Sequence, residues 1–437
     1  MSDFMKKARK AVEDLGLRPR RETLEIYYLS DGEKYCRKLS NGSYVVENLS
    51  AVRRFLRLAG FSSCKGDERI SEVDDILSEV HEKKIIAGVL KSGVLEPGLY
   101  YLENKERVVV TRGPEKVEPV QGDFSVFASL VKSLLGEEQQ IHFYGLLQNK
   151  VLSLYKGLHH SSQALFLIGK PKGGKSLLQN MISKILGNRQ ANPLAWLTGT
   201  NKFNSELFGA IHLRMDSEFL AAGSKREKII LDALLNKIVD VDLQPVFQKY
   251  GSSFSIAPHW QPSASLNCEP RCLACLPELT GDNLNRLQVY YCTPINFVTL
   301  RDRFGIMEDR EALDLALSLE VPAIVWHLLN GFSLPPELQD EHCHVRGYVS
   351  PVVEELCWRF SDEHTVFEAL KQIHLGKNLS KSEYEIGRAL EESGIHNVVG
   401  SYLRQGRNWT TFLSAMSRRF PAQIQPRQNN EWQLDFR

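Results

Sequence analysis

The stretch LFLIGKPKGGKSLLQNMISKIL (residues 165–186) decides the fold of this chain. It runs from an apolar strand pattern through a glycine-rich turn into apolar residues at helical spacing, and the turn reads G-x-x-x-x-G-K-S. Glycines let backbone N–H groups close around phosphate oxygens, the lysine reaches the terminal phosphates, and the serine hydroxyl binds Mg²⁺. Because the turn has both its flanking strand and its flanking helix, the stretch predicts a site for ATP and Mg²⁺.

Within this turn, we expect Lys175 to contact the phosphates and Ser176 to bind Mg²⁺. The other predicted nucleotide contacts are Gly169, Lys170, Pro171, Lys172, Gly173, Gly174 and Leu177.

The composition sets the class of protein. The 437 residues are long enough for two or three domains, and 43% hydrophobic with 24% charged residues is typical of a globular protein. The charged N-terminus and the lack of a long apolar run predict neither a signal peptide nor a membrane span. Dispersed cysteines favour reduced thiols and a cytoplasmic location, or the nucleus for a eukaryotic virus. The net charge of +1 restricts any nucleic-acid contact to local patches.

Residues 1–122 are expected to form a separate α+β region. The pattern predicts helices at 52–58 and 70–80, and strands within 23–29, 35–46, 98–102 and 107–111. Basic residues between positions 6 and 21 would suit DNA, although a charged run is more often a solvated face. No aspartate pair in an apolar strand suggests a polymerase metal site here.

After the glycine-rich turn, an apolar element at 210–215 ends in Asp216, Ser217 and Glu218. An ATPase of this type needs an acid at the end of a neighbouring strand to orient the Mg²⁺-bound water, and usually a second acid to polarise the attacking water. We expect Asp216, as a Mg²⁺ ligand, and Glu218 in these roles, although acids at strand ends also cap helices.

Two further polar residues lie at the ends of predicted strands. Asn267 ends a strand-like run at 255–265, and there it would hold the lytic water or sense the γ-phosphate. Arg286 opens a strand-like run at 287–291 and would act as a finger on the ATP of a neighbouring subunit. Its alternative role is a surface salt bridge.

Five segments taken together resemble the ordered motifs of the superfamily III helicases, and most closely the helicase part of phage and plasmid primase-helicases. The segments are FLIGKPKGGKS, the strand ending in MDSEF, the predicted hairpin VFQKYGSSFSIAPHW, SASLNCEP and LNRLQVYY. The resemblance covers about residues 125–300, less than half of the chain.

This resemblance implies an AAA+-like α/β core that assembles as a ring, expected to be a homo-hexamer, with ATP at the subunit interfaces. Carried over by residue, Lys175 and Ser176 bind phosphate and Mg²⁺, and Asp216 with Glu218 forms the acidic motif. Asn267 becomes the sensor, and Arg286 becomes the trans-acting finger.

The same resemblance places Lys249 and Tyr250 at the tip of a hairpin that grips single-stranded DNA in the channel. One lysine per subunit would form a positive funnel along the phosphates while the net charge stays near zero. The N-terminal region has neither a His-hydrophobe-His nicking motif nor primase acids, so a separate primase or polymerase would supply the primer.

The chain after residue 300 is predicted to hold a helical lid (301–375) and a winged-helix domain (376–437). The pattern gives helices at 380–390 and within 401–420, then a hairpin at 422–436. Arginines at the presumed recognition helix would contact DNA, with protein contact as the alternative. These arginines are Arg407, Arg418 and Arg419.

Cysteines 268, 272 and 275 have a spacing that suggests zinc, with His259 or Cys292 as a fourth ligand. The apolar residues between them favour buried thiols instead.

The sequence patterns and the resemblance together imply an α/β protein whose central P-loop, AAA+-like ATPase core (123–300) lies between an α+β N-terminal region and a C-terminal winged-helix domain. The predicted function is an ATP-dependent DNA helicase or translocase in the replication of a mobile element, phage or virus. One alternative is a nucleotide-switched regulator that assembles on DNA without unwinding it. A small-molecule kinase is a third reading, and it predicts a monomer.

Overall fold

The computed structural model describes most of the chain, in two compact units. The described residues are 19–29, 32–65, 70–157, 161–216, 225–239, 243–249, 253–277, 279, 281–306, 310–393, 408–427 and 431–437. Contacts group Met1–Asn267 with Cys275–Val349, and Cys268–Ala274 with Ser350–Arg437. These units are coarser than the four segments expected from the sequence, whose limits stay predictions.

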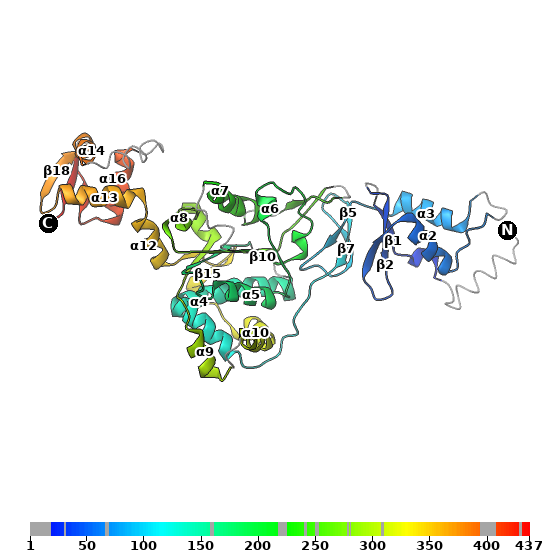
Figure 1. Cartoon of the computed structure of the whole chain (residues 1–437). Coiled ribbons are helices and arrows are strands. Elements are labelled where there is room, and N and C mark those ends of the chain that lie inside the picture. Colours follow the sequence, from blue (N-terminus) through cyan, green and yellow to red (C-terminus); the bar gives the residue numbers. More distant parts are fainter. Residues whose placement is uncertain are drawn as a thin grey trace. The chain divides into compact units, whose positions relative to one another are not determined.

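A six-stranded parallel sheet forms the centre of the first unit (Figure 1). In spatial order its strands are β17 (Tyr348–Val349), β14 (Leu287–Cys292), β8 (Ala164–Gly169), β13 (Gln261–Leu266), β10 (His212–Met215) and β9 (Gln190–Ala191). Every neighbouring pair is parallel. Every residue of β8 and β13 is buried, as expected for strands covered on both faces. The predicted α/β fold is confirmed at this level.

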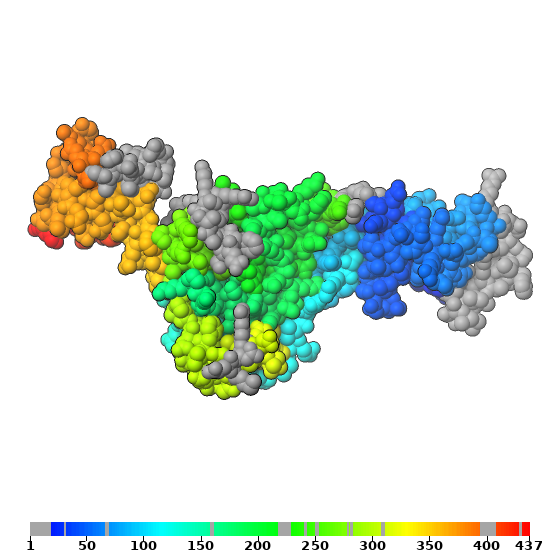
Figure 2. Space-filling model, in the orientation of Figure 1, coloured from blue at the N-terminus to red at the C-terminus, as the bar shows by residue number. Residues whose placement is uncertain are grey.

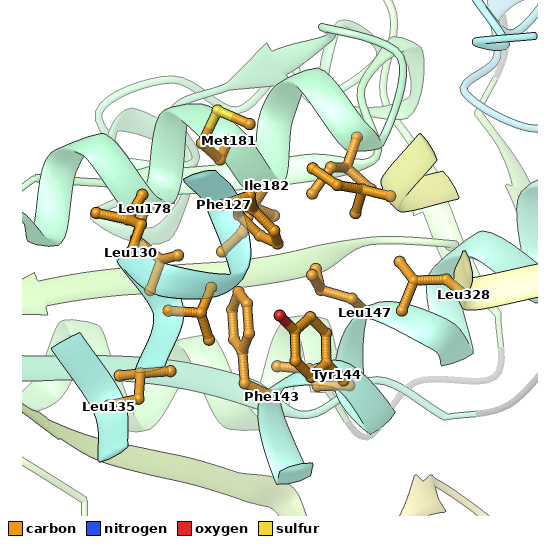
Figure 3. Close-up of a cluster of buried hydrophobic side chains, with 14 of the residues drawn as sticks. Phe127, Leu130, Leu135, Phe143, Tyr144, Leu147, Leu178, Met181, Ile182 and Leu328 are labelled. Atoms are coloured by element: carbon orange, nitrogen blue, oxygen red, sulfur yellow. The ribbon is translucent and has the colours of Figure 1, made fainter. Parts of the chain in front are cut away.

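Helix α4 (Ser125–Lys156) supplies much of the core beside this sheet. It breaks at Gly136, where φ is 75° and ψ is 177°, so the residues form two helices joined by the glycine. Figure 3 shows Phe127, Leu130 and Phe143 of α4 beside Leu178 and Ile182 of α5 (Lys175–Ile185). Burying a side chain of this size stabilises the fold by roughly 1.5–3 kcal/mol.

One described helical stretch, Glu311–Gly331, is long and apolar enough to span a membrane by length and composition alone. It comprises α10 (Arg310–Leu319), α11 (Val321–Trp326) and one turn of π-helix. Leu317 and Ile324 are fully buried in the core. The carboxylate of Glu320 accepts hydrogen bonds from the backbone N–H groups of Val126 (3.0 Å) and Phe127 (2.7 Å). These are the contacts of a core helix, and they fix the start of α4.

The N-terminal part contains two small sheets. The first has the order β3 (Tyr44–Glu47), β2 (Lys34–Lys38), β1 (Ile26–Leu29) and β4 (Ile85–Ile86), with α2 (Leu49–Leu58) and α3 (Glu72–Lys83) packed against it. The second has the order β5 (Gly88–Lys91), β7 (Arg107–Arg112) and β6 (Gly98–Tyr101). Both predicted helices are confirmed, whereas the sequence analysis missed β5.

The second small sheet packs against the part of the same unit that holds the central sheet. The Gly93 N–H donates to the Phe208 carbonyl (2.9 Å), and Arg189 donates to the Ser92 carbonyl (3.2 Å). A Cβ at Gly187 would overlap the carbonyl oxygen of Glu115. Figure 2 shows the cyan surface of this segment continuing into the green surface of the core.

The C-terminal unit contains a three-stranded antiparallel sheet with the order β18 (Asn378–Ser382), β20 (Glu431–Asp435) and β19 (Ile424–Pro426). The helices among its described residues are α8 (Pro270–Leu273), α12 (Pro351–Arg359), α13 (Asp362–Ile373), α14 (Glu383–Glu392) and α16 (Trp409–Arg419). The helix predicted from residue 380 is wrong at its start, because residues 378–382 pair with β20 and Ser382 caps α14 together with Glu385. The predicted hairpin is confirmed as β19 and β20.

Other described helices and strands complete the first unit. They are α6 (Leu194–Leu197), α7 (Lys225–Leu234), α9 (Phe297–Phe304), β11 (Gln244–Val246), β12 (Phe254–Ile256), β15 (Gln339–Asp340) and β16 (His344–Val345).

Candidate functional site

Three of the predicted site residues meet at one edge of the central sheet. The carboxyl ends of parallel strands share an edge, and ligands of such sheets bind there. Leu266 pairs with Ile168, so Asn267 follows beside Gly169, and Met215 pairs with Ala264, so Asp216 follows β10 two strands away from β8. Strand β13 therefore lies between the strand of the glycine-rich loop and that of Asp216, as the role predicted for Asn267 requires.

The glycine-rich loop (residues 169–174) has a backbone that few other residues would adopt. Gly174 has a φ of 104° and Lys172 a φ of 59°. A Cβ at Gly169 would lie 2.5 Å from the Cys292 carbonyl oxygen. Glycine is therefore required at 169 by the neighbouring strand and at 174 by the backbone angle.

Lys175 is folded into this loop. Its side chain is buried, and Nζ donates to the carbonyls of Gly169 and Lys170 at 2.8 Å each. Ser176 follows it, exposed, in the first turn of α5. A helix N-terminus presents unpaired N–H groups and partial positive charge, so an ammonium and a helix start in one loop suit a phosphate.

Asp216 is held by an arginine that the sequence analysis missed. Both Nε and Nη2 of Arg214 donate to Asp216 Oδ1, at 3.0 and 2.9 Å, and Nη1 donates to Asn180 of α5. A cation two residues before the acid, in a short strand, was the available signal. Glu218, the second predicted acid, lies outside the described residues.

A buried polar network joins α5 to the strands β10 and β13. His212 contacts Ser183 of α5 and Ser263 of β13, each at 2.7 Å, and Gln179 donates to Ser263 at 2.8 Å. Burial, and secondarily the charge of Arg214, lowers the pKa of His212 to about 3, so the ring is neutral. The network ties α5 to the strands that carry Asp216 and Asn267.

Asn267 has an unused acceptor at this edge. Its Oδ1 is buried and has no hydrogen-bond partner among the described residues. Leaving such a group unpaired costs roughly 1–3 kcal/mol. This amide oxygen is therefore suited to accept a hydrogen bond from a water or a ligand in the site.

Arg286 lies at the opposite edge. Leu287 at the start of β14 pairs with Ala164, while Cys292 at its end pairs with Gly169. Six residues of strand separate Arg286 from the glycine-rich loop level, on the order of 20 Å at the usual rise per residue. The structure therefore does not bring Arg286 to the site of its own chain.

The predicted hairpin is confirmed as β11 and β12, which pair antiparallel. Lys249 is exposed close to its tip, and Tyr250 lies outside the described residues. The sequence analysis missed Asn204, a buried residue whose side chain accepts from the Phe247 N–H (2.7 Å) and donates to the Pro245 carbonyl (2.8 Å). Asn204 thereby holds the β11 strand from outside the hairpin.

An exposed lysine and an aromatic ring precede Asn204. The Nζ of Lys202 lies 5.4 Å from the ring centroid of Phe203. The sequence analysis did not select this pair, because a single Lys-Phe dipeptide carries no motif. Its attachment to the Lys249 hairpin through Asn204 appears only in the fold.

The C-terminal arginines differ in their contacts. The guanidinium of Arg419 lies 4.4 Å from the Trp358 ring centroid and contacts Glu355 at 3.4 Å, so it packs against α12. Arg418 is exposed and donates to the Ser414 carbonyl. Arg407 lies outside the described residues, and DNA contact by these arginines stays a prediction.

Among the described residues, no three His, Cys, Asp or Glu side chains come close enough to hold a metal ion. Mg²⁺ binding by Ser176 and Asp216, which needs phosphate and water oxygens as further ligands, also stays a prediction.

No family model and no curated protein matches this chain. Among solved structures, it is similar to the apo structure of the NrS-1 C-terminal region, with 13% identity, a TM-score of 0.54 and 97% of each chain covered. The A form apo structure of the same region gives 12% identity and a TM-score of 0.52, covering 97% of this chain and 98% of that chain. The match to the active helicase SCCmec type IV Cch has 12% identity and covers 91% of this chain and 74% of that one. Its TM-score of 0.29 is too low to indicate a shared fold. At these identities, the first two structures show a shared fold.

Proposed function

We propose that this chain is an ATP-driven DNA helicase or translocase that works as a ring of identical subunits, six by the resemblance. It would serve the replication of a mobile element, phage or virus. The observation that carries the proposal is the order of the central strands, with β13 and Asn267 between the glycine-rich loop and Asp216 while Arg286 is at the far edge.

Within one subunit, Lys175 and the start of α5 would bind the phosphates of ATP, and Ser176 and Asp216 would hold Mg²⁺. The metal would neutralise charge on the transferred phosphoryl group. Asn267 would orient the attacking water through the acceptor that has no partner in the described structure. Arg214 would keep the Asp216 carboxylate beside α5 until the site is filled.

The position of Arg286 supports action between subunits. At about 20 Å from the glycine-rich loop level of its own chain, it would reach only the nucleotide of a neighbour. There it would stabilise charge as it develops in the transition state.

Single-stranded DNA would be held by Lys249, with Lys202 and Phe203 beside it. Lysines around a ring would follow the phosphates, and an aromatic ring is suited to stack on a base. In the C-terminal unit, the order helix, strand, two helices and hairpin supports a winged-helix domain in which Arg418 is free of the α12 packing that holds Arg419.

The proposal is tested with purified protein, ATP and a forked DNA substrate. Lys175→Ala should abolish ATP turnover, since the ammonium that contacts phosphate is gone. Lys249→Ala should keep turnover within about twofold and lower strand displacement by at least roughly tenfold, because each subunit loses its phosphate contact. Lys105→Ala, at an exposed turn of the N-terminal part, is the matched control and should behave as wild type.

The nucleotide-switched regulator predicts a different result. It would assemble on DNA in the presence of ATP, and neither the wild type nor any variant would displace a strand. The kinase reading predicts a monomer whose turnover does not respond to DNA and needs no Arg286.

A further inference from the structure

Three glutamines are fully buried at the amino edge of the central sheet. Gln261 begins β13, Gln163 directly precedes β8, and Gln288 lies in β14, and each has 0% of its surface exposed. Burying an amide is costly unless its donors and acceptor are paired. The amide hydrogens of all three are paired, and of their acceptors Gln261 Oε1 has no partner among the described residues. Their hydrogen bonds indicate which parts of the chain they fix.

Gln163 holds the residue that precedes Arg286. Its Nε2 donates to the carbonyl of Asn285 (2.8 Å) and to that of Val345 (2.9 Å), so both amide hydrogens are used. Its Oε1 accepts from Nε2 of Gln288 (2.9 Å). Asn285 and Arg286 are consecutive, so this side chain fixes the backbone from which Arg286 extends.

The other two glutamines hold Gln163 in place. Gln288 donates to the Arg346 carbonyl (2.7 Å) and accepts from the hydroxyl of Tyr290 (2.7 Å). Gln261 donates to the backbone carbonyl of Gln163 at 2.9 Å. The network therefore extends from β13, whose other end precedes Asn267, to the segment at residues 345–346.

Gly347 holds the same loop from a second direction. A Cβ at this position would overlap the Leu284 carbonyl oxygen and would lie 2.9 Å from Asn285 Cα. Any larger residue would push the loop that carries Arg286. The backbone at 284–285 is thus fixed by Gln163 and by close contact with Gly347.

We infer that Gln163 is a positioning residue for Arg286, and that Arg286 acts on the nucleotide site of a second copy of this chain. The inference rests on the proposed function. An arginine that enters a neighbour's site from a half-buried position must be aimed before the reaction, because reorganisation would reduce its electrostatic benefit. Three buried amides on adjacent strands supply that rigidity from inside the sheet.

The test compares Gln163→Met with Gln148→Met. Gln148 is also buried and also donates to two carbonyls, those of Leu328 (2.9 Å) and Phe332 (3.0 Å). Its Oε1 contacts His344 (2.9 Å), and it has no bond to residues 283–286. A misplaced catalytic group lowers kcat by up to roughly 100-fold, so we expect Gln163→Met to lose about 10- to 100-fold in kcat. The Kd for ATP should stay within about twofold, since the variant's own site is intact. Gln148→Met should keep the kcat of the wild type.

Mixed assemblies distinguish positioning from general damage. A Lys175→Ala subunit has a defective nucleotide site but an intact Arg286. Mixed with Gln163→Met subunits, it should restore turnover above the sum of the separate proteins, because it supplies a correctly placed arginine to their sites. Mixing Gln163→Met with Arg286→Ala should restore nothing.

Gly347→Ala covers the case in which Gln163→Met does not fold. It displaces the same loop from outside the glutamine network and should show the same loss of kcat and the same restoration by Lys175→Ala. If Arg286→Ala loses turnover while Gln163→Met and Gly347→Ala keep it, the positioning inference is overturned and the proposed function stands. Wild type without turnover, or Arg286→Ala with full turnover, overturns both.

Discussion

His212 illustrates how burial sets the charge of a single side chain in β10, the strand that precedes Asp216. Its folded pKa of about 3 lies below the ordinary 6.5, so between these values the unfolded chain binds a proton that the native chain does not. Stability should therefore fall as the pH falls through this range, by about 3 kcal/mol between pH 6.5 and pH 4.

The measurement is denaturant unfolding of the wild type and of His212→Gln, whose amide can contact Ser183 and Ser263 but does not titrate. As the pH falls, the free energy of unfolding of the wild type should decrease relative to that of His212→Gln. Parallel curves from pH 7 to pH 4 would show that His212 is not buried as a neutral ring.

Local residues of the site could be predicted, and distant partners could not. Lys175 and Gly174 belong to one turn, so spacing alone selected them. Asn204 acts 41 residues before its partner Pro245, and Gln163 acts 122 residues before Asn285. Such pairings depend on which strands lie side by side, and a single sequence does not carry that information.

The hairpin of β11 and β12 is held in place by a residue outside it. An isolated hairpin is marginally stable, and here Asn204 adds two side-chain bonds, one to Pro245 of β11 and one to Phe247 directly after it. We expect Asn204→Ala to loosen the hairpin by roughly 1–3 kcal/mol, because the Phe247 N–H and the Pro245 carbonyl lose their partner. ATP turnover should persist while strand displacement falls.

Hydrogen exchange at the Phe247 amide is the direct measurement. Asn104→Ala, which removes the bonds of an exposed turn to Glu106, is the matched control and should leave that amide unchanged. Unchanged exchange in Asn204→Ala would mean that the strand is held by other contacts.

Helices and strands were predicted where their own apolar pattern was long. They were missed where pairing with a neighbouring strand determines the structure. The strand ALFLIG and the helix α5 that follows the glycine-rich loop are determined by their own residues. Strand β17 has only two residues and exists because β14 offers an edge. Residues 378–382, NLSKS, are polar enough to be read as a helix start, but pairing with β20 makes them a strand.

The whole molecule has a net charge of only +1, so its contacts with DNA must come from local groups. The salt dependence of DNA binding measures how many phosphates these groups contact. Each phosphate contact to a single strand changes the slope of log Kobs against log salt by about 0.7. If each subunit of a ring contributes one Lys249, the slope should weaken in Lys249→Ala by about 0.7 for every engaged subunit, up to roughly 4 for six. Titration of a labelled single strand with a non-hydrolysable ATP analogue measures both slopes.

A difference of about 0.7 would correspond to one contact per complex, and the lysines would then not act as a ring. A difference near zero would remove Lys249 from the DNA site even if the ring assembles.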